Sequence, residues 1–396
     1  MHNKTSVLST VSIYHAFNDG SVAVIPLLFP IFKTLLKLTY TQVGIITGGG
    51  LLITLLTQLV IGRQADIKNR STLLSIGILL LSGSLLLLTH IQGFFTLLLF
   101  ILILRFSAGF FHPVGVGWIS QTFKRDRLDW AMGMQSAFGD FGAFIAISTT
   151  LFIVEITDWS FPFYLWSIAG ILCLFLGIYL LRNSRSNPVA NANNYLTRNN
   201  IKTSIIKEAA TIKKIKLLLP GIVISGSAWG IIITYLPLLL HEKTALSLSI
   251  IGVVVSIWIG IGTITCIFYG KIQLLLGREN VVILSYLIIG LMCFSLSIFT
   301  NTLILIIIMI FLGISTFLTY PALFSFISEI TDEGYEGKTF GYIFTFQLGG
   351  GTILLILGGI TADIWGIWTP FILLGILCLF VAIIFFYYRH KLTTLG

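Results

Sequence analysis

The fold is decided by the stretch Ile101-Leu-Ile-Leu-Arg-Phe-Ser-Ala-Gly-Phe-Phe-His-Pro-Val-Gly-Val-Gly-Trp-Ile-Ser120. It is apolar enough to cross a bilayer, yet it carries an arginine, a histidine and a proline. Arg105, Gly109 and His112 stand at i, i+4 and i+7, so a helix presents them on one face. An arginine that faces lipid near mid-bilayer costs at least about 2.5–3.5 kcal/mol. We therefore expect this face to point into the protein, toward water or an acidic partner.

A second copy of this stretch lies 208 residues further along the chain. Tyr320-Pro-Ala-Leu-Phe-Ser-Phe-Ile-Ser328 resembles His112-Pro-Val-Gly-Val-Gly-Trp-Ile-Ser120. Glycines, prolines and an arginine match in the same register: Gly44 with Gly252, Gly62 with Gly270, Arg70 with Arg278, Pro113 with Pro321, Gly133 with Gly341, Gly142 with Gly350, and Pro162 with Pro370. Matches of these residue types over a long stretch indicate an internal duplication.

The composition is that of a membrane protein. Hydrophobic residues make up 56% of the 396 positions and charged residues only 10%, against about 25% charged residues in soluble domains. With about 20 apolar residues per crossing, the candidate spans are 8–32, 42–62, 72–90, 95–121, 131–155, 160–181, 217–240, 249–270, 280–299, 302–327, 339–361 and 367–388. The sequence predicts an all-α, polytopic membrane protein with twelve transmembrane helices in two pseudo-symmetric six-helix bundles.

The bundles are expected at residues 1–182 and 217–396, and a polar linker at 183–216 joins them. In the linker, Ile205, Ile206, Ile212 and Ile215 lie among five lysines between Ile201 and Lys216, a pattern typical of a basic amphipathic helix on the cytoplasmic membrane surface. A positively charged topology anchor is its simplest role, and lipid sensing is the alternative.

The net charge of +9 follows membrane topology. If the N-terminus is cytoplasmic, every lysine and arginine lies on a cytoplasmic segment except four: Lys33, Lys37, Lys243 and Arg105. This is the positive-inside bias, and it argues against a nucleic-acid-binding patch. We expect a multi-pass protein of the plasma membrane with both termini in the cytoplasm.

Several motifs resemble those of the major facilitator superfamily. Gly62-Arg-Gln-Ala-Asp-Ile-Lys-Asn-Arg70 is similar to its G-x-x-x-D-x-x-x-R loop, and Arg105-Phe-Ser-Ala-Gly109 is similar to its helix 4 motif. His15-Ala-Phe-Asn-Asp19, Phe111-His-Pro113 and Gly139-Asp-Phe-Gly142 resemble elements of fosmidomycin-resistance-type transporters. The resemblance implies solute transport by alternating access and, for this subfamily, drug efflux.

The same resemblance implies that the loop with Gly62, Asp66 and Arg70 is a conformational latch that stabilises an outward-open state. Simple capping of the next helix by the aspartate is the alternative.

The second half departs from the pattern by losing ionisable groups. Leu274 replaces the loop aspartate, Leu348 stands where Asp140 stands in the first half, and Gly313 stands where Arg105 does. The charge chemistry is therefore concentrated in the first, fourth and fifth spans.

Those three spans carry the candidate coupling residues, which are His15, Asn18, Asp19, Arg105, His112 and Asp140. All are expected at overlapping depth near mid-membrane, where a carboxylate that changes partner between two conformations can bind and release a proton. The alternatives are structural: an aspartate that neutralises Arg105, and histidines that bond backbone carbonyls. No ligand spacing singles out a metal site, so we expect no metal and no cofactor.

The second half contributes aromatic and amide side chains, with Trp229, Tyr235, Tyr320 and Gln347 as candidate solute contacts. They suit a semi-polar organic solute, and ordinary interhelical packing is the alternative for each. Pro113 and Pro321 are expected to kink equivalent helices that line a central cavity.

The sequence thus predicts a proton-coupled secondary transporter of a small organic solute, working as a monomer in the lipid bilayer and exporting by antiport. One alternative is a symporter that imports an organic acid or phosphonate-like anion, with Arg105 binding the anion. Another is a membrane enzyme that uses His15, His112 and Asp19 on a lipid; the mid-depth placement of these groups in a duplicated scaffold argues against it.

Overall fold

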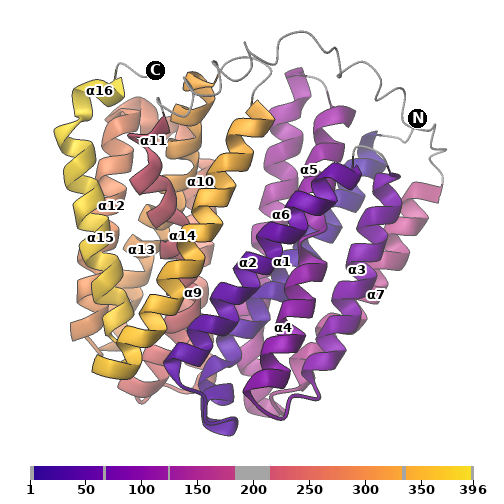
Figure 1. The fold of residues 1–396 in the computed structure, drawn as a ribbon, viewed down its shortest axis with the longest axis horizontal. Helices are drawn as coiled ribbons and strands as arrows, with labels where there is room; N and C mark the ends of the chain where they lie inside the picture. The colour runs from indigo at the N-terminus through magenta and orange to yellow at the C-terminus, as the bar shows by residue number, and fades with distance from the viewer. Residues whose placement is uncertain (1–3, 66–67, 124, 183–214, 332–335, 394–396) are drawn as a thin grey trace. The chain divides into compact units, whose positions relative to one another are not determined.

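The computed structural model describes residues 4–65, 68–123, 125–182, 215–331 and 336–393. Every regular element within these ranges is a helix (Figure 1). The first half contains α1 (Lys4–Leu35), α2 (Tyr40–Ala65), α3 (Arg70–Leu88), α4 (Phe94–Ala108), α5 (Phe111–Thr122), α6 (Arg125–Ile156) and α7 (Phe161–Arg182). The second half contains α9 (Leu219–Lys243), α10 (Leu248–Ile267), α11 (Tyr269–Leu276), α12 (Arg278–Ile298), α13 (Thr302–Ile330), α14 (Glu336–Trp365), α15 (Thr369–Tyr387) and α16 (Arg389–Thr393).

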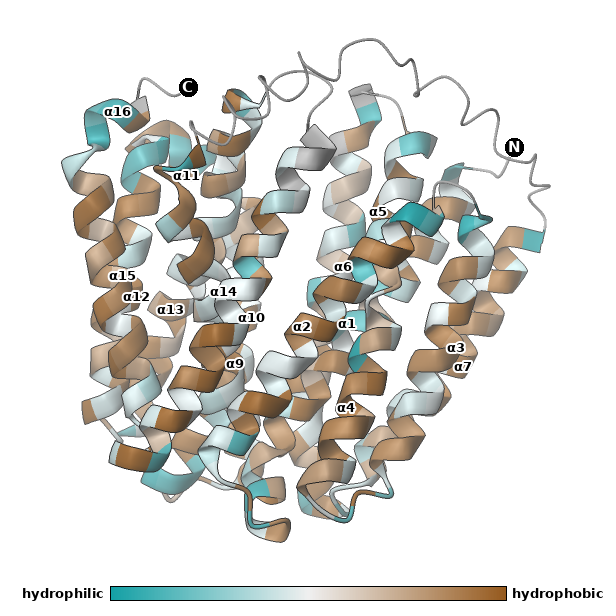
Figure 2. Cartoon of the chain, in the orientation of Figure 1, coloured by the Kyte–Doolittle hydropathy of each residue, from teal (hydrophilic) through white to brown (hydrophobic). Residues whose placement is uncertain are grey.

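Within the described ranges, twelve helical segments are long and apolar enough to cross a membrane, which confirms the predicted fold class. Figure 2 shows hydrophobic residues along most of the long helices and hydrophilic residues gathered toward their ends and in the short helix α16. The segment predicted at 95–121 is found at Phe94–Thr122, and the one predicted at 302–327 at Thr302–Ile330. The polar linker, with nearly all of its expected amphipathic helix, lies outside the described residues.

The chain divides into two compact units. Unit 1 comprises Met1–Leu38, Gly49–Tyr195 and Ser247–Val253, and unit 2 comprises Thr39–Gly48, Leu196–Leu246 and Val254–Gly396. In unit 1, α1 packs against α6 and α7, and α3 against α4 and α7. In unit 2, α12 packs against α13 and α15, and α9 against α14.

Glycines set how closely α1 and α6 approach. A Cβ atom at Gly142 of α6 would lie 1.9 Å from the carbonyl oxygen of Ala16 on α1. Only glycine permits this approach of two backbones, a device common between membrane helices. The close packing holds the polar face of α1 against α6, where the candidate site lies.

The internal duplication is visible in side-chain contacts. Arg70, the first residue of α3, donates to Gln121 at the end of α5 in unit 1. Arg278, the first residue of α12, pairs with Glu329 near the end of α13 in unit 2. Both residues of the second pair lie 208 positions after those of the first. The contact is therefore preserved between the two halves, but the partner of the arginine is neutral in unit 1 and acidic in unit 2.

A second repeated contact lies at two helix N-termini. In unit 1 the Glu155 carboxylate accepts from the backbone N–H of Ser249, 2.8 Å away, at the start of α10. In unit 2 the Asp363 carboxylate accepts from the backbone N–H groups of Tyr40 and Thr41, 2.7 and 2.8 Å away, at the start of α2. Each carboxylate satisfies donors that a helix leaves free in its first turn.

The two repeated prolines affect their helices differently. The fourth span is interrupted between α4 and α5, at Gly109 and Phe110. Pro113 has no N–H to donate to the carbonyl of Gly109, so one α-helical hydrogen bond is missing there. α13 continues through Pro321 without interruption, and Phe317 stands at the position equivalent to Gly109.

Candidate functional site

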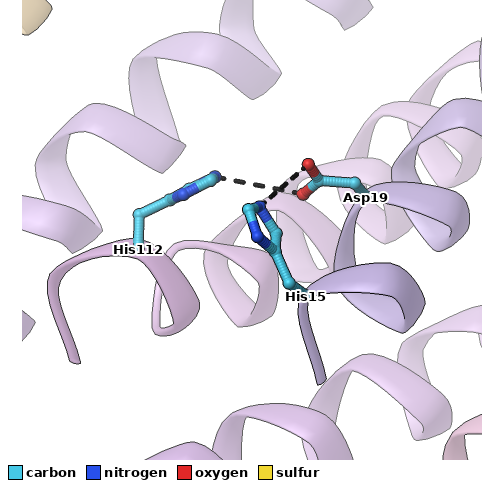
Figure 3. A group of neighbouring side chains, drawn as sticks. All are labelled: His15, Asp19 and His112. Carbon is cyan, nitrogen blue, oxygen red and sulfur yellow. Dashed lines mark ion pairs between the residues drawn. The ribbon is translucent and has the colours of Figure 1, made fainter. Parts of the chain in front are cut away.

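Three ionisable side chains meet in unit 1, and we call His15, Asp19 and His112 the His–Asp–His cluster (Figure 3). His15 and Asp19 lie one turn apart on α1, and His112 reaches them from the first turn of α5. One Asp19 carboxylate oxygen is 3.1 Å from His15 Nε2, and the other is 4.0 Å from His112 Nε2. Asn18 donates to the second oxygen from its side-chain amide at 2.9 Å. The structure thus brings four of the sequence-predicted residues together.

His15 is held on three sides. Its Nδ1 lies 2.7 Å from the backbone carbonyl oxygen of Gln135 on α6, and its ring stacks on Phe111 with centroids 4.4 Å apart. A Cβ atom at Gly139 would lie only 2.6 Å from His15 Nε2, so α6 has no room for a side chain there. The imidazole is buried and its orientation is set by the packing of α6 on α1.

The acid and the second histidine are more accessible. The side chain of Asp19 is 29% exposed and that of His112 is 44% exposed, against 7% for His15. Asp19 and His112 therefore form the more exposed side of the cluster, and His15 forms its buried side.

Arg105 and Asp140 lie near the cluster without joining it. Both are within electrostatic range of Asp19, but among the described residues neither makes an ion pair within 4 Å. The Arg105 stem packs on α2, where a Cβ atom at Gly50 would lie 2.9 Å from its Cγ. Thr54 of α2 also donates to the Arg105 carbonyl oxygen at 3.3 Å. The guanidinium is held in place by helix packing.

Unit 2 places a neutral polar group at the equivalent location. Tyr320 donates to the backbone oxygen of Ser225 at 3.2 Å, and the Gln347 amide donates to the Ser225 hydroxyl at 3.0 Å. We call these three residues the Tyr–Ser–Gln cluster. In the internal repeat, Tyr320 corresponds to His112 and Gln347 to Gly139.

The other predicted residues have local partners. The rings of Trp229 and Trp258 lie 6.1 Å apart, and buried Tyr235 donates to the Leu355 carbonyl oxygen at 2.6 Å. A Cβ atom at Gly62 would lie 3.6 Å from the Pro113 ring. Asp66 lies outside the described residues, whereas Arg70 contacts Gln121 as described above.

Sequence reasoning missed two contributors to the site, Gln135 and Ser225. Gln135 acts through its backbone carbonyl, which every residue type has, so no sequence signal marks it. Ser225 is a small polar residue in an apolar span, which is common and therefore uninformative. The close approach of Gly139 did have a signal, because it begins the Gly139-Asp-Phe-Gly142 motif.

Comparison with known proteins decides the family. The model of the Major Facilitator Superfamily matches residues 11–355 and 276–394. The chain belongs to the Major Facilitator Superfamily. This confirms the superfamily predicted from the loop and helix 4 motifs, and it makes the chain a membrane transporter rather than an enzyme. The narrower fosmidomycin-resistance-type resemblance stays a prediction.

Individual relatives agree with this assignment. The chain is 31% identical over 121 residues to the uncharacterized MFS-type transporter YfnC of Bacillus subtilis (strain 168), a match that spans 30% of each chain. It superposes on a bacterial homologue of the human lysosomal transporter Spinster with a TM-score of 0.80, covering 99% of this chain and 98% of that one at 13% identity. The nucleoside transporter NupG gives a TM-score of 0.79 over 96% and 99% of the two chains at 14% identity. These two likenesses establish the fold.

Proposed function

We propose that this transporter is proton-coupled and exports a small organic solute by antiport. The observation that carries the proposal is the His–Asp–His cluster, an ionisable group inside membrane-spanning helices. Ionisable residues at such depth are costly and mark ion or substrate pathways. Alternating access of the two units, in a plasma membrane with both termini cytoplasmic, completes the scheme.

The His15–Asp19 pair provides the proton site. Because Nδ1 of His15 faces the Gln135 carbonyl, that nitrogen carries the hydrogen. Nε2 then faces an Asp19 oxygen at 3.1 Å, and a proton between these two atoms makes the contact favourable. His112, 4.0 Å from the other oxygen, is placed to exchange that proton. A conformational step that moves His112 relative to Asp19 would change how tightly the proton is held.

The Tyr–Ser–Gln cluster suits the solute. It offers neutral donors and acceptors on three helices. In the same unit, half-buried Trp229 adds aromatic surface and lies against fully buried Trp258. Neutral hydrogen-bonding groups beside aromatic rings are typical of sites for semi-polar organic molecules. The resemblance to fosmidomycin-resistance-type transporters supports the outward direction.

The energy released by one proton entering the cell is sufficient to maintain a large concentration gradient of the solute. One charge moving through 100 mV supplies about 2.3 kcal/mol, which corresponds to about a 50-fold concentration ratio. A pH difference adds about 1.4 kcal/mol per unit.

The latch remains part of the proposal. Gly62, Asp66 and Arg70 form the loop that the superfamily resemblance implicates in stabilising the outward-open state. The contact between Arg70 and Gln121 supports a role for the arginine in joining α3 to α5.

Symport of an organic anion is the second candidate function, and Arg105 favours it. Its guanidinium has no carboxylate within 4 Å among the described residues, and its Nε lacks a hydrogen-bond partner. A guanidinium in this state is suited to a carboxylate or phosphonate. Import would then follow the proton inward.

Proteoliposomes with a pH-sensitive dye inside separate these possibilities. We expect solute addition to change the internal pH with the parent protein, and Asp19→Asn to reduce that change at least tenfold. Asp158→Asn is the matched control, because Asp158 is an acid in the loop between α6 and α7. Solute accumulation driven by an acidic interior indicates antiport, and accumulation driven by an acidic exterior indicates symport. An unchanged signal with Asp19→Asn would remove Asp19 from the proton path.

A further inference from the structure

The His–Asp–His cluster has the donor set of a metal site. It offers two imidazole nitrogens and one carboxylate oxygen, and the ligand atoms of the three residues lie within 4.8 Å of one another (Figure 3). Two imidazoles with one carboxylate suit first-row transition metals such as Zn²⁺ and Co²⁺. Mg²⁺ and Ca²⁺ prefer all-oxygen ligands.

The tautomer of His15 presents a lone pair to this set. Nδ1 donates to the Gln135 carbonyl oxygen at 2.7 Å, so in the neutral ring Nε2 is unprotonated. Nε2 is buried, has no hydrogen-bond partner, and faces a carboxylate oxygen 3.1 Å away. Two acceptors in this position require a proton or a metal cation between them. A backbone carbonyl on the far nitrogen is also the usual outer partner of a metal-binding histidine.

The distances are near those of a tetrahedral ion. Ligands at about 2.0–2.1 Å from a tetrahedral Zn²⁺ lie about 3.3 Å from one another. Asp19 has one oxygen 3.1 Å from His15 Nε2 and its other oxygen 4.0 Å from His112 Nε2. With one ligand atom from each residue, the three atoms lie within 4.8 Å of one another, so a shift of up to about 1.5 Å brings them to the tetrahedral spacing. The His112 side chain has room for this shift, because it is 44% exposed.

The surroundings support a fixed ligand and a balanced charge. Phe111 stacks on His15, and the backbone at Gly139 blocks the other direction, so the imidazole is held before any ion arrives. Asp140 lies within electrostatic range of both Asp19 and His15. Two carboxylates near one dication reduce the net charge that the membrane interior must hold.

We propose that His15, Asp19 and His112 bind one divalent transition-metal cation of the Zn²⁺ type in unit 1, leaving its fourth position open. The inference rests on the same side chains as the proposed proton site, but its test measures metal binding and does not require transport.

Co²⁺ is the probe, because its visible absorption intensifies and shifts when it is bound by three or four protein ligands. The full chain, purified in detergent and freed of metal with a chelator, is titrated with Co²⁺. We expect one Co²⁺ per chain, displaced by Zn²⁺. Asp19→Asn and His112→Gln should each weaken binding by at least about 100-fold, because each removes a direct ligand and the loss of an outer-shell partner alone costs about 10–100-fold. His90→Gln is the matched control, because His90 is an exposed histidine at the end of α3, and it should bind as the parent does.

His112→Cys keeps the test decisive if another variant fails to fold. A thiolate at this position should retain Co²⁺ and add a sulfur-to-cobalt charge-transfer band in the near ultraviolet. If the side chain at position 112 has only a structural role, the cysteine variant will not show this band. The absence of stoichiometric Co²⁺ binding by the parent overturns the inference, as does parent-like binding by Asp19→Asn and His112→Gln. Co²⁺ binding by the parent protein, together with a normal pH signal from Asp19→Asn in proteoliposomes, would leave the metal site standing and remove the proposed proton role. No Co²⁺ binding by the parent protein, together with loss of the pH signal in Asp19→Asn, would overturn the metal site and leave the proton role standing.

Discussion

The His–Asp–His cluster of unit 1 and the Tyr–Ser–Gln cluster of unit 2 occupy equivalent places in a duplicated chain. Tyr320 stands where His112 does, and Gln347 stands where Gly139 does. One cluster is ionisable and partly exposed at Asp19 and His112, and the other is neutral. The duplicated halves keep equivalent helix positions, but the side chains at these positions have diverged.

The difference teaches how a membrane transporter can divide its tasks. Each charge inside a bilayer is expensive, so gathering the ionisable groups in one half limits that cost. The neutral half can then bind a solute through hydrogen bonds and aromatic contact without changing the net charge. The arginine contacts at the helix ends diverge in the opposite direction, because Arg70 of unit 1 contacts a neutral glutamine and Arg278 of unit 2 pairs with a glutamate.

The substitution with the largest expected effect is Gly139→Ala. Its new Cβ atom would lie 2.6 Å from His15 Nε2 and displace the imidazole from Asp19. A displacement of about 1 Å in a positioned site can cost about 100-fold in rate. We expect solute-dependent proton flux in proteoliposomes to fall by about that factor.

Gln347→Ala is the matched variant in unit 2. It removes the amide that donates to Ser225, and we expect it to raise the KM for solute while leaving the ratio of protons to solute unchanged. Parent-like proton flux with Gly139→Ala, or loss of proton coupling with Gln347→Ala, would show that the two clusters do not divide the tasks as proposed.

The second test concerns how rigidly each cluster is held. A Cβ atom at Gly142 would lie 1.9 Å from the Ala16 backbone oxygen, whereas one at the equivalent Gly350 would lie 2.5 Å from a Val223 side-chain carbon. Backbone cannot give way as a side chain can, so Gly142→Ala should reach or exceed the upper end of the usual overpacking cost, about 3 kcal/mol.

In a thermal unfolding assay in detergent, Gly142→Ala should lower Tm by about 6–12 °C, and Gly350→Ala by clearly less. Equal shifts for both variants would contradict the idea that α1 and α6 are locked more tightly than their counterparts α9 and α14.

The smallest expected effect separates the two arginine contacts. Glu329→Gln converts the ion pair of unit 2 into the neutral contact found in unit 1. Because Arg278 and Glu329 are 23% and 38% exposed, the loss should be at most about 1 kcal/mol. The corresponding drop in Tm is about 2–4 °C and should shrink in 1 M salt, where the Debye length is about 3 Å. A drop in Tm that salt leaves unchanged would mean that packing, and not charge, distinguishes the pair.

Much of the architecture follows from local composition. Twelve spans, the duplication and the superfamily can be recognised from the sequence because a membrane crossing is a long apolar run, and because glycine, proline and arginine matches stand out against leucine and isoleucine. The concentration of ionisable groups in the first, fourth and fifth spans is equally visible.

The meeting of His15, Asp19 and His112 depends instead on three-dimensional packing. The face that each helix turns toward its neighbours is set by distant contacts, such as that of Gly142 with Ala16. The Gln135 carbonyl that orients His15 leaves no mark in the sequence, because every residue has one. Arg105 shows the opposite case. Its charge is obvious in the sequence and predicts an acidic partner, yet helix packing holds it more than 4 Å from every described carboxylate. Residue types show which chemistry is available, and the packing of helices selects the groups that come into contact.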